Sequence, residues 1–157
     1  MNPFADVDYH IRMRGMKCKG LIICIGCATL FSAAAFSDCG SLENAYGPFD
    51  YTNPNHRKEK MPIVTKGHFP PYVENLIRGK TGSLASDLDY TLRAFPNHHR
   101  ALYSMTKYQL RNPDLQGRQK PRYTVDCYFD RAIRFKSDDG LVYMLYGIYL
   151  HKQRKHE

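Results

Sequence analysis

The chain has 157 residues, of which 43% are hydrophobic and 24% are charged, and its formal net charge is +8. This is the size of one ordinary globular domain, so the chain can bury a core and is not expected to hold several domains. In a cytosolic protein the charge would suggest nucleic acid, whereas outside the cytoplasm it favours acidic peptides, cell-envelope polymers or anionic lipid surfaces. A solvated surface without any target is the plain alternative.

Residues 1–37 have the pattern of a secretory signal peptide. Basic residues precede an uncharged stretch of 16 residues, Leu21 to Phe36, which is shorter than the roughly 20 residues that cross a bilayer. We expect cleavage after Ser37, with an uncleaved signal anchor as the alternative that would keep the protein on a membrane. In either case the rest lies outside the cytoplasm. The sequence therefore predicts an exported protein of the periplasm or cell envelope, without nucleic acid as a partner.

Cleavage changes both the charge and the cysteine count. Residues 1–37 hold four basic and two acidic residues, so the remainder keeps a net charge of +6. Only Cys39 and Cys127 remain, and two cysteines in an oxidising compartment favour one disulfide. The alternative is a partly buried thiol at Cys127 and a disordered tail at Cys39.

Residues 38–69 are predicted to form an irregular arm. They contain Gly-Pro, Asn-Pro and Met-Pro steps and no sustained apolar period. Their aromatic side chains argue against simple disorder, because Tyr46, Phe49 and Tyr51 are expected to pack across a helical body.

Residues 70–157 have the apolar periodicity of α-helices, so the fold class is predicted to be all-α. Prolines open helices in their first turn and stop them elsewhere, which fixes most of the boundaries. The predicted helices are 70–78, 83–95, 98–111, 123–136 and 141–152. Residues 112–122 are polar, hold two prolines and a glycine, and form an exposed loop.

Two stretches of this helical region repeat each other at a lag of 41 residues. Apolar or aromatic residues recur at the positions that a helical hairpin buries, and small residues recur where two helices approach closely. The pairs are Leu84/Val125, Leu88/Phe129, Leu92/Ile133, Leu102/Tyr143, Thr106/Gly147 and Tyr108/Tyr149.

These residues resemble a tetratricopeptide repeat (TPR), a unit of about 34 residues in two antiparallel helices. First-helix positions are taken by Leu102, Met105 and Thr106, and second-helix positions by Val125, Phe129 and Ala132. Pro96 matches the closing proline, Ser137 replaces it one repeat later, and a seven-residue insertion in loop 112–122 accounts for the longer lag. Two segments, YGPFDYTNP and DLDYTLRAFPNHHRALYSM, are similar to small exported bacterial TPR-like proteins.

The resemblance covers residues 70–153 and implies antiparallel helical hairpins stacked as a short solenoid, with the irregular arm in front. About three units make a stable array, and this chain supplies about two and a half. The arm, another chain or a partner is expected to supply the remainder.

The predicted binding site lies on the helix 98–111. Arg100, Tyr103, Lys107 and Arg111 form a stripe along it, and TPR proteins turn this helix toward their concave surface. Such a stripe suits a protein or an acidic peptide, and a merely solvated face is the alternative. The sequence thus predicts an interaction scaffold without catalytic activity.

Other polar groups are predicted to be structural. No metal ligand, cofactor site or catalytic residue is predicted, because no group has the spacing of a zinc site or of a nucleophile with its base. The groups are His98-His99 as a polar turn and cap, Asp87 with Asp89 on different faces of a helix, and Asp138 with Asp139 in a capping turn.

The alternative function is a small envelope enzyme or envelope-polymer-binding factor. Its working parts would be the histidine pair and the basic residues Arg118, Lys120 and Arg122 of the loop. A closed pocket that gathered these groups would favour it over the scaffold.

The helix 141–152 has too many apolar residues for one face. A terminal repeat normally presents a polar outer side to stay soluble. We therefore expect its exposed side to be covered by a second copy in a homo-oligomer, by a partner, or by the aromatic arm around Tyr46 and Phe49.

Overall fold

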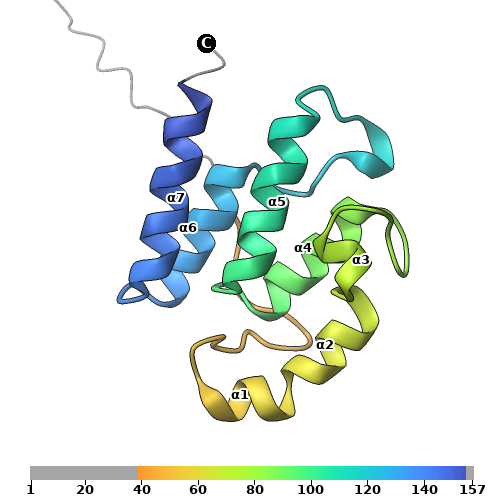
Figure 1. Cartoon of the computed structure of the whole chain (residues 1–157). Coiled ribbons are helices and arrows are strands. Elements are labelled where there is room, and N and C mark those ends of the chain that lie inside the picture. Colours follow the sequence, from red (N-terminus) through yellow and green to blue (C-terminus); the bar gives the residue numbers. More distant parts are fainter. Residues whose placement is uncertain (1–38, 155–157) are drawn as a thin grey trace, which may run out of the picture. The chain divides into compact units, whose positions relative to one another are not determined.

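The computed structural model describes residues 39–154, and these form an all-α fold, as predicted (Figure 1). The predicted signal peptide, residues 1–37, lies outside the described residues. The helices are α1 Pro54–Glu59, α2 Met61–His68, α3 Pro71–Glu74, α4 Leu84–Ala94, α5 His99–Arg111, the 3-10 helix η1 Gly117–Gln119, α6 Val125–Phe135 and α7 Gly140–Gln153. Within residues 39–154, none of these helices combines the length and the apolar character that spanning a bilayer requires.

The bounds of the helices reproduce the lag of 41 residues. Helix α6 begins 41 residues after α4 and has the same length, and α7 begins 41 residues after α5. The N-cap residues correspond too, because the hydroxyls of Ser83 and Thr124 each accept the N–H three residues later, at 3.1 Å and 3.3 Å. The same local chemistry therefore starts both helices.

Each of these helices packs on its neighbours in the chain. Helix α5 contacts α4 before it and α6 after it, and α6 contacts α7. Helices α5 and α7 also contact each other and run side by side in the same direction (Figure 1). The core between them contains Leu88, Leu92, Leu102, Met105 and Phe129, all almost fully buried.

The arm predicted for residues 38–69 is irregular only as far as Asn53, so that prediction was wrong for α1 and α2. The side chain of Asn53 accepts the N–H of Asn55 at 2.9 Å and Pro54 follows as the first helical residue. Pro62 likewise lies in the first turn of α2. Proline lacks an N–H, which costs nothing at a helix start, so these prolines begin helices instead of breaking them.

The aromatic residues of the arm pack on the helical body, as predicted. Tyr46, Phe49 and Tyr51 lie against a small second core of Val64, Ala94 and Phe95. The Phe49 and Phe95 ring centroids are 5.4 Å apart, and the Phe49 N–H donates to the carbonyl oxygen of Ala94 at 2.8 Å. This segment therefore covers the end of α4.

The predicted disulfide between Cys39 and Cys127 is confirmed, with Cα atoms 5.1 Å apart. It joins the first described residue to α6. The buried side chain of Arg131, one turn further along α6, donates from Nη1 to the carbonyl oxygens of Cys39 at 2.9 Å and Ser41 at 2.6 Å. Hydrogen bonds from the Arg131 side chain thus hold the same segment that the disulfide attaches to α6.

Candidate functional site

The four residues of the predicted stripe lie on α5, and none of them is buried. Arg100 and Arg111 are exposed, 41% of Tyr103 is exposed, and Lys107 is half-buried. Their spacing of three and four residues keeps them on one side of the helix.

The positive charges of the stripe differ in how far acidic side chains of the protein already neutralise them. Arg100 donates to Glu74 of α3 from both Nε and Nη2, so its charge is already balanced. Lys107 lies over the Tyr103 ring, with Nζ 4.5 Å from the centroid. Neither Lys107 nor Arg111 pairs with an acidic side chain among residues 39–154. The free positive charge of the stripe therefore lies at its C-terminal end.

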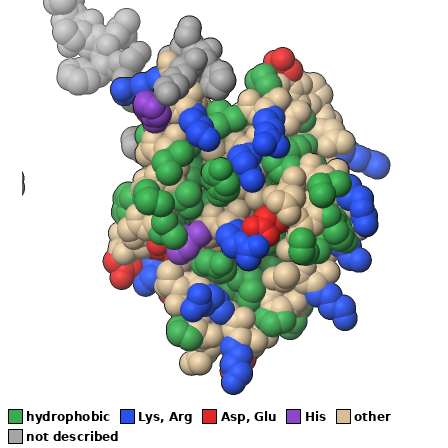
Figure 2. Space-filling view, in the orientation of Figure 1, with side chains coloured by type: hydrophobic (Ala, Val, Ile, Leu, Met, Phe, Trp, Pro, Cys, Tyr) green, Lys and Arg blue, Asp and Glu red, His purple; other side chains and the backbone are tan. Residues whose placement is uncertain are grey.

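An apolar stripe on α7 lies next to the basic one. The residues 41 positions after Arg100, Tyr103 and Lys107 are Leu141, Met144 and Ile148, and they are 40–53% exposed. Equivalent residues of two parallel, adjacent helices face the same side. Figure 2 shows hydrophobic side chains over α7 beside Lys and Arg side chains over α5.

We call this surface the α5–α7 face. It comprises Arg100, Tyr103, Lys107, Arg111, Leu141, Met144 and Ile148. The sequence predicted the basic half and an exposed apolar side on helix 141–152, but not that the two lie next to each other, although the lag of 41 residues contained the signal.

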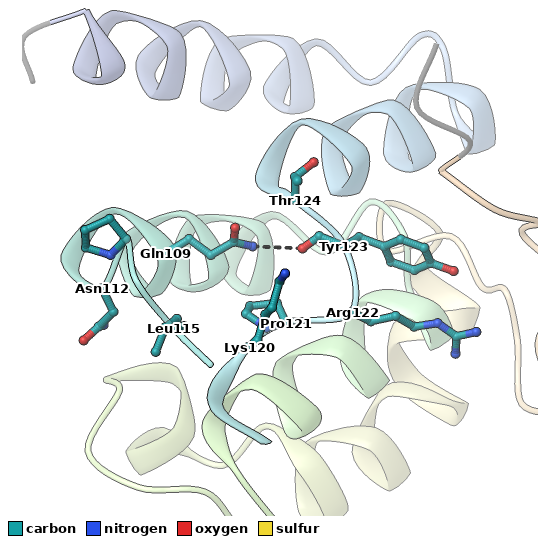
Figure 3. Close-up of a pocket in the computed structure, with 9 residues that line it drawn as sticks. Gln109, Asn112, Leu115, Lys120, Pro121, Arg122, Tyr123 and Thr124 are labelled. Carbon is teal, nitrogen blue, oxygen red and sulfur yellow. Dashed lines mark hydrogen bonds between the residues drawn. The ribbon is translucent and has the colours of Figure 1, made fainter. Parts of the chain in front are cut away.

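The loop 112–122 contributes to a separate cavity of about 350 Å³ at the other end of α5 (Figure 3). Lys120 and Arg122 belong to its lining, and Gln109 crosses it to donate to the Tyr123 carbonyl oxygen at 3.1 Å. The histidine pair is at the start of α5, about 18 Å away along a helix of this length. The groups required by the alternative function are therefore not gathered in one pocket.

His98 and His99 both have structural partners. His98 is buried, its Nδ1 accepts the N–H of Ala101 at 3.2 Å, and its ring stacks on Tyr51 at 4.2 Å. Burial lowers the pKa of His98 to about 3, so the ring is neutral at pH 7. The Nε2 atom of His99 lies 2.8 Å from Oδ2 of Asp139, which also accepts from Asn97.

The acidic residues of α4 are held apart by different partners. Asp87 is buried and accepts the N–H of Lys80 at 2.6 Å and the hydroxyl of Thr81 at 2.6 Å. Burial acts to raise the pKa of Asp87, but the hydrogen bonds from Thr81, His68 and Lys80 outweigh it and hold the pKa below its ordinary value. Asp89 instead accepts from the Tyr128 hydroxyl at 2.8 Å. Residues 39–154 contain no group of three or more His, Cys, Asp or Glu side chains placed to hold a metal ion.

Comparison with protein-family models, with curated proteins and with solved structures finds no match to this chain. The resemblance to TPR proteins therefore rests on the repeated residues of the sequence.

Proposed function

We propose that the protein is an exported, TPR-like interaction scaffold that binds an acidic peptide or helix with apolar side chains on the α5–α7 face. The observation that carries the proposal is the pair of unbalanced cations, Lys107 and Arg111, beside the exposed apolar residues Leu141, Met144 and Ile148. The protein has no chemistry of its own in this proposal.

The order of helix contacts supports a TPR-like arrangement. Helix α5 packs on α4, α6 and α7, as the first helix of a hairpin repeat packs on its own partner and on its neighbours. Small Thr106 is buried in the middle of α5, where a close approach of helices requires a small side chain. In such an array α5 and α7 would line the concave side.

The chemistry of the face selects the ligand. Acidic side chains would neutralise Lys107 and Arg111 and would steer association at low salt. Apolar side chains of the same ligand would cover Met144 and Ile148, which are unusually exposed for large hydrophobic residues. A ligand with only acidic side chains would leave the apolar residues exposed, and one with only apolar side chains would leave the cations without a partner.

Export is supported by the pattern of residues 1–37 and by the disulfide. Disulfides persist in oxidising compartments and are rare in the cytosol. We therefore place the scaffold in the periplasm or cell envelope.

Selection of displayed random peptides on the full chain tests the proposal. We expect enriched peptides to combine acidic and apolar residues. The double variant Lys107→Glu/Arg111→Glu should bind them roughly tenfold more weakly or worse, as measured by fluorescence anisotropy, with little change in melting temperature.

The control is Arg57→Glu/Lys58→Glu, which makes the same change of charge on exposed residues of α1. It should bind the selected peptides as the unchanged chain does. Equal weakening in both variants would reduce the effect to net charge, and unchanged binding in the first variant would refute the proposed face.

A further inference from the structure

The outward side of α7 has a regular row of exposed residues that the α5–α7 face does not include. They are Gly140, Tyr143, Gly147, Leu150 and Arg154, and all five are exposed. Their spacing alternates between three and four residues, which is the spacing of the seam where two helices pack along each other. We call this row the α7 seam.

The equivalent row on α5, 41 residues earlier, is buried at its centre. Leu102 and Thr106 of α5 correspond to Tyr143 and Gly147, yet they are only 1% and 5% exposed. Gln109, which corresponds to Leu150, donates to the carbonyl oxygen of Tyr123 just before α6. The centre of this side of α5 is therefore buried inside the molecule, and at Gln109 the segment leading into α6 contacts it.

On α7, no helix of residues 39–154 takes that place. Of the three coverings expected from the sequence, the aromatic arm packs elsewhere, because Tyr46 and Phe49 lie against Val64, Ala94 and Phe95. Figure 1 shows α7 as the outermost helix of the hairpins, with no other helix of residues 39–154 on the side opposite α5 and α6.

We infer that a second copy of this chain covers the seam, through an antiparallel pair of α7 helices related by a two-fold axis midway between Tyr143 and Gly147. In this register Tyr143 lies opposite Gly147 of the second copy, and Leu150 lies opposite Gly140 of the second copy. The layers formed by Gly140, Tyr143, Gly147 and Leu150 then each join a large side chain to a glycine, and Arg154 lies beyond the last of them. A Cβ atom added at either glycine would meet nothing within 4 Å in the single chain, so the space for the large side chains exists.

Size complementarity excludes the parallel arrangement. A parallel pair would place glycine against glycine and Tyr143 against Tyr143, which leaves gaps in some layers and crowds others. The antiparallel pair also suits the charges. Lys152 lies at the C-terminal end of α7, and this register brings it opposite Asp138 of the second copy, whose side chain is 78% exposed and pairs with Lys136 of its own chain at 3.0 Å.

The dimer leaves the α5–α7 face accessible, because Leu141 and Ile148 lie on another side of α7. A single pair of 14-residue helices is a small interface. We therefore expect a weak dimer with a dissociation constant on the order of micromolar.

Sedimentation velocity of the full chain over a hundredfold range of concentration tests the dimer. The unchanged chain should pass from monomer to dimer, and Gly147→Gln should shift this transition at least tenfold toward higher concentration, because the new side chain occupies the space for Tyr143. Glutamine favours a helix more than glycine does, so circular dichroism should show retained helicity. The control Ile148→Gln, off the seam, should dimerise normally. A monomer throughout, or an equal shift in both variants, would overturn the inference.

Cysteine cross-linking tests the register, in a chain with Cys18, Cys24 and Cys27 changed to serine. A mixture of Gly140→Cys and Leu150→Cys chains should form a covalent dimer on oxidation. Leu150→Cys alone should not, because the two cysteines would be about 15 Å apart along the helix axis, beyond the roughly 7 Å that a disulfide allows. Cross-linking of Leu150→Cys alone, or none in the mixture, would overturn the antiparallel pair.

Discussion

His98 shows how one buried residue couples folding to pH. Its ring is packed between Tyr51 and Phe69 and caps α5 by accepting the N–H of Ala101. A proton on this ring would have to be buried with it, and burial lowers the pKa of His98 from its ordinary 6.5 to about 3.

The stability of the protein should therefore decrease as the pH falls from 6.5 toward 4.5. In this window the unfolded histidine binds a proton and the folded one does not, which costs about 1.4 kcal/mol for each pH unit. His98→Asn keeps a good N-cap and removes the titrating group, so its urea midpoint should vary much less between pH 6.5 and 4.5. Parallel pH profiles for the two proteins would contradict this assignment.

For the residues of the stripe, the sequence predicted their positions on the helix but not which of them form ion pairs within the protein. Periodicity alone placed Arg100, Lys107 and Arg111 on one side of a helix. Glu74 balances Arg100 from α3, 26 residues earlier, and a contact between two helices has no local signal in the sequence.

At the scale of the elements, helices α4 to α7 could be predicted almost to their ends. Caps and apolar periods agree there, as in Ser83 before α4 and Thr124 before α6. Helices α1 and α2 could not be predicted in this way, because the steps Asn53-Pro54 and Met61-Pro62 are compatible both with the end of a helix and with the start of one. For α2, packing of Met61 and Val64 in one cluster with Phe95, far along the chain, favours the start of a helix.

The segment 39–53 is attached to the helices both by the disulfide and by non-covalent contacts. The disulfide spans 88 residues, and a loop of this length stabilises by roughly 4 kcal/mol in the chain-entropy model. The hydrogen bonds of Arg131 and the packing of Phe49 are independent of it. Cys39→Ser/Cys127→Ser should therefore lose up to about 4 kcal/mol of unfolding free energy, measured with urea.

The same variant should keep the segment in place. The amide of Phe49, which donates to Ala94, should still exchange slowly in hydrogen-exchange NMR relative to exposed amides of α1. Fast exchange at Phe49 together with intact α4 to α7 would show that the disulfide alone holds the segment.

Across the molecule, the helices differ in how many neighbouring helices they pack against. Helix α5 packs on α3, α4, α6 and α7, whereas α1 has no buried residue. Native-state hydrogen exchange should therefore rank α5 as the slowest element and α1 as the fastest. Slower exchange in α1 than in α5 would show that the hairpins do not form one cooperative core.

Arg131 has a consequence for the order in which the protein matures. Its guanidinium group donates hydrogen bonds to the backbone carbonyl oxygens of residues 39–41. These hydrogen bonds do not require the disulfide. In the reduced chain we expect these contacts to bring Cys39 in front of Cys127, one turn before Arg131. The arginine would thus act as a template that aligns these two thiols before an oxidant joins them.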